Sequence, residues 1–188
     1  TKIEKQVNYL DAHKDAGAVF THAKIIDENS TLITDDSNPY YQKFNQPNRN
    51  RFEWLRYFFY HGNALCNPSG LRRKASLNNL NLNFGFIQLP DLALWVQLCL
   101  KYEIHVIQEE LTQFRVDSNK VSWSADKPKN RIRINYETLK ILDFYKQIPS
   151  KEALLNIFPE ASNFISEEYT DILFALGMVS LTTATTSQ

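Results

Sequence analysis

The sequence predicts an α/β fold, with a body of alternating helices and strands followed by an almost entirely helical C-terminal region. Up to about residue 116, segments with helical spacing of apolar residues alternate with short apolar runs typical of strands. Beyond that point the remaining periodic segments are helical. Of the 188 residues, 43% are hydrophobic, which is enough for one domain with a core. We therefore expect a body of residues 1–120 and a helical extension of residues 121–188.

The body opens with a helix and a strand. In KIEKQVNYLDAHK, Ile3, Val7 and Leu10 recur at helical spacing, and GAVFTHAKIIDENS is largely apolar until its polar turn. Residues 34–50 hold prolines and many Asn and Asp residues, which predicts a long loop.

Further helices and one strand complete the body. RFEWLRYFFYHG predicts a helix that ends at Gly62. NALCNPSGLRRKASL predicts an extended segment that leads into a helix. Residues 91–101 form another expected helix, and the strand EIHVI follows it.

The C-terminal region begins after a loop over residues 117–129. NRIRINYETLKILDFYKQI predicts a long helix with four apolar residues on one side, Ile132, Tyr136, Leu139 and Leu142. Two more helical segments are expected near residues 150–158 and 164–181.

Composition excludes several classes of protein. Lys and Arg total 21 and Asp and Glu total 21, and this zero net charge argues against nucleic acid as a partner. No run approaches the roughly 18 apolar residues of a transmembrane segment, and we expect a cytoplasmic protein. Cys66 and Cys99 lack metal-ligand spacing, so we expect buried free thiols in a reducing compartment. P-loop, GxGxxG and nucleophile-elbow motifs are absent.

Asp91 is the most conspicuous candidate for chemistry, because it is a single carboxylate at the start of an apolar helix, LPDLALWVQLCL. One interpretation is a helix N-cap, in which the carboxylate accepts backbone N–H bonds. The other is a general base, since ligands of open α/β sheets bind near strand ends. The two interpretations are compatible.

Several cations are candidates for anion contacts. Arg115 follows the last predicted strand of the body, and it is either a surface or salt-bridged arginine or an anion contact, since a guanidinium suits phosphate or carboxylate. The triplet Arg72, Arg73 and Lys74 is either a solvated helix start or a phosphate contact.

The order of three stretches carries a resemblance. They are YLDAHKDAGAVFTHAKIIDENS, FFYHGNALCNPSGLRRKA and LPDLALWVQLCLKYEIHVIQEELTQFRV. Together they resemble the second half of the inverting GT-A glycosyltransferases of family two, and the resemblance covers roughly residues 2–118. The tail from SADKPKNRIRINYETLKIL resembles the helical extension of many of these enzymes. The fold class is then a truncated GT-A body with an all-helical extension.

The resemblance implies transfer of a sugar from a nucleoside diphosphate to a glycan acceptor hydroxyl, with inversion, in bacterial surface polysaccharide synthesis. It implies that Asp91 is the base, that Asn63 contacts the donor sugar, and that Arg73 and Arg115 contact diphosphate or acceptor. Asp117 stands roughly where the family has a metal-contacting His. Pro90 departs from the family, which usually has Glu at this position.

The nucleotide-binding half of such an enzyme, with its Asp-x-Asp motif for Mg²⁺ or Mn²⁺, has no counterpart here. The chain starts at Thr1 rather than Met, and we expect it to be a piece of a longer protein. We therefore expect no metal in this chain alone, and an exposed sheet edge that favours dimerisation. Contact with the inner face of the membrane is a further expectation. Two alternatives stay open: a non-catalytic helical interaction module, and a degenerate transferase that binds sugar without turnover.

Overall fold

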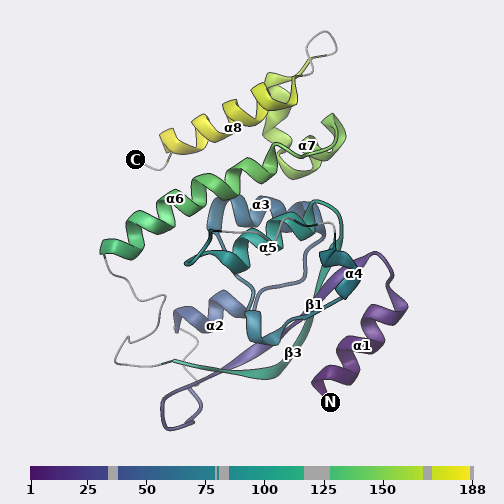
Figure 1. Cartoon of the computed structure of the whole chain (residues 1–188), viewed down its shortest axis with the longest axis vertical. Coiled ribbons are helices and arrows are strands. Elements are labelled where there is room, and N and C mark those ends of the chain that lie inside the picture. The colour runs from purple at the N-terminus through teal and green to yellow at the C-terminus, as the bar shows by residue number, and fades with distance from the viewer. Residues whose placement is uncertain (34–37, 79, 81–84, 117–127, 167–170, 187–188) are drawn as a thin grey trace.

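The structure, a computed structural model, describes residues 1–33, 38–78, 80, 85–116, 128–166 and 171–186. Within these residues a small sheet is covered by helices, and a group of helices from the C-terminal part lies over one end of it (Figure 1). The expected α/β class is confirmed.

The sheet has three strands in the order β2-β1-β3. β1 (Ala16–Ile26) lies in the centre, antiparallel to the short β2 (Leu71–Arg72) and parallel to β3 (Glu103–Arg115). β3 is longer than the predicted strand EIHVI. Its register against β1 shifts near His22, where Thr21 pairs with Ile107 but His22 pairs with Glu110. The polar residues after Ile107 thus continue the strand through a bulge, which interrupts the expected alternation.

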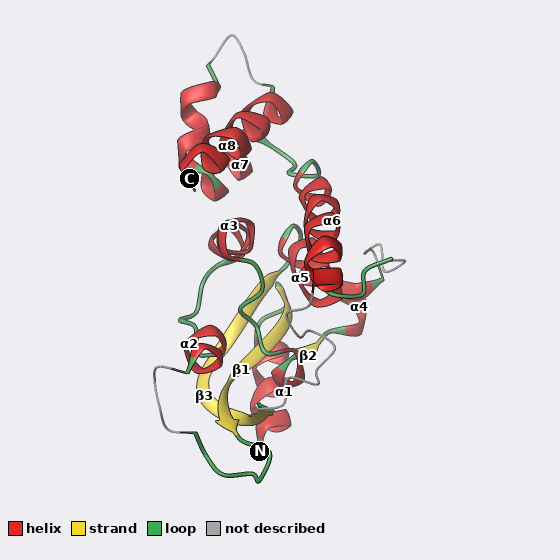
Figure 2. Cartoon of the chain, turned by 90° about the vertical axis from the view of Figure 1, so that its left-hand side faces the viewer, coloured by secondary structure: helices red, strands yellow, loops and turns green. Residues whose placement is uncertain are grey.

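Helices cover both faces of the sheet. Val19 of β1 packs with Leu10 of α1 (Lys2–Ala12) on one face, whereas Ala18 and Phe20 join the main core on the other. The main core contains α3 (Arg51–His61) and α5 (Pro90–Cys99), and Figure 2 shows these helices near the upper ends of β1 and β3, with α1 lower down beside the sheet. This division follows from the two-residue period of a strand.

Part of the predicted loop 34–50 forms a short helix, α2 (Pro39–Phe44). Asn38 caps it by accepting the backbone N–H of Tyr40, and Pro39 occupies the first helical position. Phe44 packs edge-on against Phe114 of β3, with ring centroids 4.8 Å apart. A contact with a strand distant in the sequence therefore stabilises a helix too short to stand alone.

A 3₁₀ turn η1 (Asn67–Ser69) and the one-turn helix α4 (Lys74–Leu77) flank β2. The C-terminal part contains α6 (Pro128–Tyr145), α7 (Lys151–Ile157), the 3₁₀ segment η2 (Pro159–Phe164) and α8 (Ile172–Thr186). No described helix has the combination of length and apolar character needed to cross a membrane.

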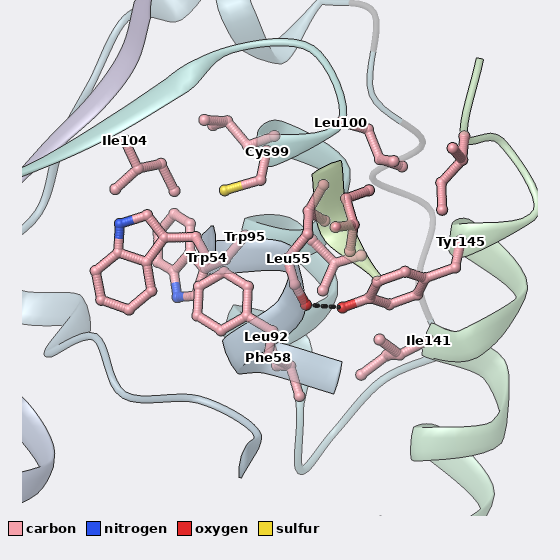
Figure 3. Packing of buried hydrophobic residues seen from close by; sticks show 14 of the residues in the cluster. Trp54, Leu55, Phe58, Leu92, Trp95, Cys99, Leu100, Ile104, Ile141 and Tyr145 are labelled. Carbon is pink, nitrogen blue, oxygen red and sulfur yellow. Dashed lines mark hydrogen bonds between the residues drawn. The ribbon is translucent and has the colours of Figure 1, made fainter. Parts of the chain in front are cut away.

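The core continues across residue 120. One cluster of buried residues joins Trp54 of α3 and Trp95 of α5 to Tyr145 of α6 and Phe158 beyond α7. Figure 3 shows Tyr145 against this cluster, where its hydroxyl donates to the carbonyl oxygen of Leu55 at 2.8 Å. Arg56 of α3 also pairs with Glu160 of η2, at 2.7 Å. The C-terminal helices therefore complete the core of the body.

α6 buries the face opposite to three of the four residues on its predicted apolar side, and the fourth, Leu142, is partly buried against the main core. Ile132, Tyr136 and Leu139 are 74%, 60% and 65% exposed, whereas Glu137 and Ile141 are buried. Polar contacts orient the helix, since Glu137 binds backbone N–H groups of the body and Tyr145 binds Leu55.

Both cysteines are buried and free, as predicted.

Candidate functional site

Asp91 lies in the first turn of α5, one residue after Pro90. The N-cap of this helix is Leu89, so the interpretation of Asp91 as the N-cap is wrong. The side chain instead accepts a hydrogen bond on Oδ1 from Nδ2 of Asn67, at 3.0 Å. Asp91 is therefore held by a side chain from η1, a segment distant in the sequence.

Burial raises the pKa of Asp91, and the nearby positive charge of Arg72 offsets part of this rise. Arg72 belongs to β2, and its guanidinium lies 5.3 Å from the ring centroid of Trp95 on α5. The position of Arg72 is thus fixed by an aromatic ring one helical turn after Asp91. A half-buried carboxylate with a raised pKa binds a proton more strongly than a solvated aspartate.

The turn that carries Asn67 is held from several sides. Buried Gln6 of α1 donates to the carbonyl oxygens of Val19 and Ser69, at 3.1 and 2.7 Å. Lys2 donates to the carbonyl oxygen of Pro68 at 3.0 Å and to Oγ1 of Thr112 at 3.4 Å. These contacts join α1, β1, β3 and η1, and they fix the partner of Asp91.

Cys66 precedes this turn and is buried. Burial raises the pKa of its thiol to about 11. A thiol that stays protonated at neutral pH is a poor nucleophile, so Cys66 contributes packing beside the site.

Glu137 of α6 holds the chain just before Asp91. Its carboxylate accepts the backbone N–H groups of Ile87, Gln88 and Leu89 at 2.9, 2.9 and 2.8 Å. The side chain is 2% exposed, so these three charge-assisted bonds are shielded from water. Glu137 was not among the site residues predicted from the sequence. Its signal was the series Glu137, Ile141 and Tyr145, which places an acid on the buried face of an amphipathic helix.

The other expected site residues that the structure describes form hydrogen bonds with backbone groups. Asn63 accepts the N–H of Leu65 at 2.9 Å. Arg73 donates to the carbonyl oxygen of Leu10, at the end of α1, at 2.5 Å.

Arg115 lies at the end of β3, where it donates to the carbonyl oxygens of Asp27 and Glu28 at 2.6 and 2.9 Å and to Ser30 Oγ at 3.0 Å. It thus holds the turn after β1. Asp117 lies outside the described residues.

Asp91 and Asn67 are therefore brought together with Arg72 by the fold. Of the expected set, Arg73 and Arg115 are bonded to carbonyl oxygens of other segments.

The described residues do not fit a metal centre. Among them no three His, Cys, Asp or Glu side chains come close enough together to hold an ion. Mg²⁺ or Mn²⁺ would therefore need ligands from outside the described residues.

Two cavities lie beside the C-terminal helices of the described part of the chain. One, of about 190 Å³, is lined by α3, α6 and α8, and a larger groove of about 840 Å³ lies beside the N-terminal half of α6. Asp91 lines neither of them.

A comparison with known proteins shows a distant similarity. The chain is 23% identical over 140 residues to the uncharacterized glycosyltransferase MJ1057 of Methanocaldococcus jannaschii. The alignment covers 74% of this chain and 44% of the relative, so the chain spans less than half of the relative's length. No family model matches the chain. A distant relationship to a glycosyltransferase is supported.

Proposed function

We propose that this chain is the second half of an inverting GT-A glycosyltransferase domain, in which Asp91 is the general base. The donor would be a nucleoside diphosphate sugar and the acceptor a glycan hydroxyl, in surface polysaccharide synthesis. The observation that carries the proposal is the environment of Asp91. It is a half-buried carboxylate with a raised pKa, held by Asn67 at a helix start.

In this mechanism Asp91 removes the proton of the acceptor hydroxyl as its oxygen attacks the anomeric carbon. A bond forms between that oxygen and the anomeric carbon, and the bond to the diphosphate breaks on the opposite side of the sugar. The proton remains on Asp91, whose raised pKa makes the transfer more favourable. Asn67 holds one carboxylate oxygen by its amide and leaves the other to face the acceptor.

The support from known proteins is coarser than this mechanism. The distant relative is a glycosyltransferase by name, and that name specifies neither the inverting outcome nor the donor. The GT-A assignment therefore depends on the order of the sequence motifs. Roles for Asn63, Arg73, Arg115 and Asp117 toward donor or acceptor belong to the same proposal, with Mg²⁺ or Mn²⁺ supplied by the rest of the protein.

A cytoplasmic location, with contact to the inner face of the membrane, completes the proposal.

The test is Asp91→Asn in the full-length protein, because this substitution keeps the size of the side chain and removes the proton acceptor. Loss of a general base lowers the rate about 10²–10⁴-fold. We expect unchanged donor affinity and nearly abolished transfer, measured with a panel of nucleotide sugars.

The matched control is Asp11→Asn, an exposed acid on α1, which should transfer at the parent rate. Transfer by Asp91→Asn within about threefold of the parent rate would contradict the assignment, since base loss costs far more than this.

A further inference from the structure

The N-terminal half of α6 exposes a row of large apolar side chains. Ile132, Tyr136 and Leu139 are 74%, 60% and 65% exposed and are spaced four and three residues apart. This spacing aligns them along one side of the helix, opposite buried Glu137. We refer to these three residues as the α6 stripe. Figure 1 shows the N-terminal turns of α6 extending beyond α3 and α5.

Cations line one edge of the α6 stripe. Lys129, Arg133 and Lys140 are four and seven residues apart, so they follow the same side of the helix as Tyr136. The ammonium group of Lys140 lies 5.6 Å from the ring centroid of Tyr136. The stripe and its cations therefore form one amphipathic surface.

The acidic residues of α6 compensate little of this positive charge. Glu137 points into the protein, where it binds the N–H groups of residues 87–89. Asp143 lies in the last turn of the helix and pairs with Lys146 at 2.7 Å, and the nearby charge of Lys140 lowers its pKa as well. Since the whole chain has zero net charge, the row of cations is a local feature.

A neighbouring segment widens the apolar surface. Ile87 is 55% exposed and lines the groove of about 840 Å³ together with Ile132 and Tyr136 of the stripe. The bond from its N–H to Glu137 fixes Ile87 beside α6.

We infer that α6 is an interfacial helix that docks this face of the protein onto a bilayer containing anionic lipids. The apolar stripe would enter the boundary between headgroups and acyl chains, and the cations would extend along it to the lipid phosphates. An exposed tyrosine on such a helix is suited to the headgroup layer. The inference depends on this surface alone and not on the proposed sugar chemistry.

A bilayer fits this surface better than a second copy of the chain does. A two-fold symmetric dimer through α6 would bring the same three cations toward their own copies, and like charges repel. Anionic lipids supply the opposite charge at the required depth beside an apolar layer.

Co-sedimentation of the full chain with vesicles tests the inference. We expect binding to vesicles of equal parts phosphatidylcholine and phosphatidylglycerol, and little binding to phosphatidylcholine alone. Combining Lys129→Glu, Arg133→Glu and Lys140→Glu should weaken binding about 100-fold, at roughly fivefold or more per cation. Combining Ile132→Gln, Tyr136→Gln and Leu139→Gln should weaken it to a similar degree, because the stripe then has no apolar surface to insert.

The matched control reverses the charge of three exposed lysines outside α6, by Lys14→Glu, Lys24→Glu and Lys74→Glu. It changes the net charge by the same amount as the variant of the α6 cations. This variant should bind anionic vesicles nearly as well as the parent chain, and circular dichroism should show all variants folded. Absence of binding by the parent chain, or equal weakening in the control, would overturn the inference. So would a dimer in solution that the stripe variant dissociates.

Discussion

Asp91 and Glu137 show how single residues prepare the candidate site. Asp91 combines partial burial with one hydrogen bond from Asn67, which leaves its carboxylate able to take a proton. Glu137 is more deeply buried, and both of its carboxylate oxygens accept hydrogen bonds from backbone N–H groups. Its role is therefore structural. The number of donors around each carboxylate thus separates the two roles.

Asp91 should make stability depend on pH. Its pKa is raised in the folded protein, so the folded state holds the proton more tightly than the unfolded chain does. At low pH Asp91 is protonated in both states, and its burial then carries no penalty for a buried charge. As the pH rises from 3.8, the ordinary pKa of an aspartate, through the raised pKa of the folded state, the protein loses stability. Relative to the parent chain, Asp91→Asn should therefore gain stability as the pH rises over this range.

Urea denaturation of both proteins at several pH values measures this difference. Taking the difference removes the contribution of other carboxylates that titrate in the same range. A difference that stays constant from acid to neutral pH would show that the folded environment leaves the proton affinity of Asp91 unchanged.

Glu137→Gln should destabilise the fold. The amide keeps one acceptor oxygen but places an NH₂ group against backbone N–H donors that the carboxylate now satisfies. A buried donor left unsatisfied costs about 1–3 kcal/mol, and we expect a loss of this size in the free energy of unfolding. Glu110→Gln, at an exposed acid on β3, is the control and should have almost no effect. Equal stabilities for the two variants would contradict the structural role of Glu137.

At the scale of elements, close packing decides how the segment around β2 meets the sheet. Gly70 follows η1, and a Cβ there would lie 2.7 Å from the ring of Phe20 on β1. Phe20 is buried and contacts Trp95 edge-on, with ring centroids 4.8 Å apart. The ring therefore has little room to move away.

Gly70→Ala should cost about 1–3 kcal/mol of stability, the usual effect of overpacking. The control is Gly177→Ala on α8, where a Cβ has no neighbour within 4 Å. That change should stabilise the protein by about 0.5–1 kcal/mol, because glycine is unfavourable inside a helix. Thermal unfolding of the two variants measures the sign of each change in stability. A stabilising effect of Gly70→Ala would contradict the close contact between Gly70 and Phe20.

For the whole molecule, the C-terminal helices and the body should unfold together. Tyr145 of α6 bonds to Leu55 of α3 within one continuous core. Tyr145→Phe removes this hydrogen bond and should lower the free energy of unfolding by about 1 kcal/mol. Tyr136→Phe, at an exposed tyrosine of the same helix, should leave it unchanged.

The fluorescence of Trp54 and Trp95 reports on the body, and Trp123→Phe in all samples restricts the signal to these two residues. We expect Tyr145→Phe to shift this transition. The opposite result would be a fluorescence transition that is unchanged in Tyr145→Phe while the loss of helical circular dichroism shifts separately. That result would mean that the C-terminal helices fold independently of the body.

Local patterns in the sequence were sufficient to locate most elements. The helices at α1, α3, α5 and α6 follow from apolar spacing, and the strand at β1 from an apolar run, because these signals depend on neighbours along the chain. The position of Asp91 at the start of a helix was predicted for the same reason. The proposed chemistry likewise came from the order of motifs, which a sequence displays directly.

Only the tertiary structure decided which surfaces meet. The apolar side of α6 is the more obvious one in the sequence, yet the helix buries Glu137 and Tyr145 and exposes Ile132. The partners that orient it, at residues 87–89 and Leu55, are distant in the sequence, and a hydrogen bond across such a separation leaves no periodic signal. The pairing of Asn67 with Asp91 and the extension of β3 through its bulge have the same origin, since both depend on how separate elements align in space.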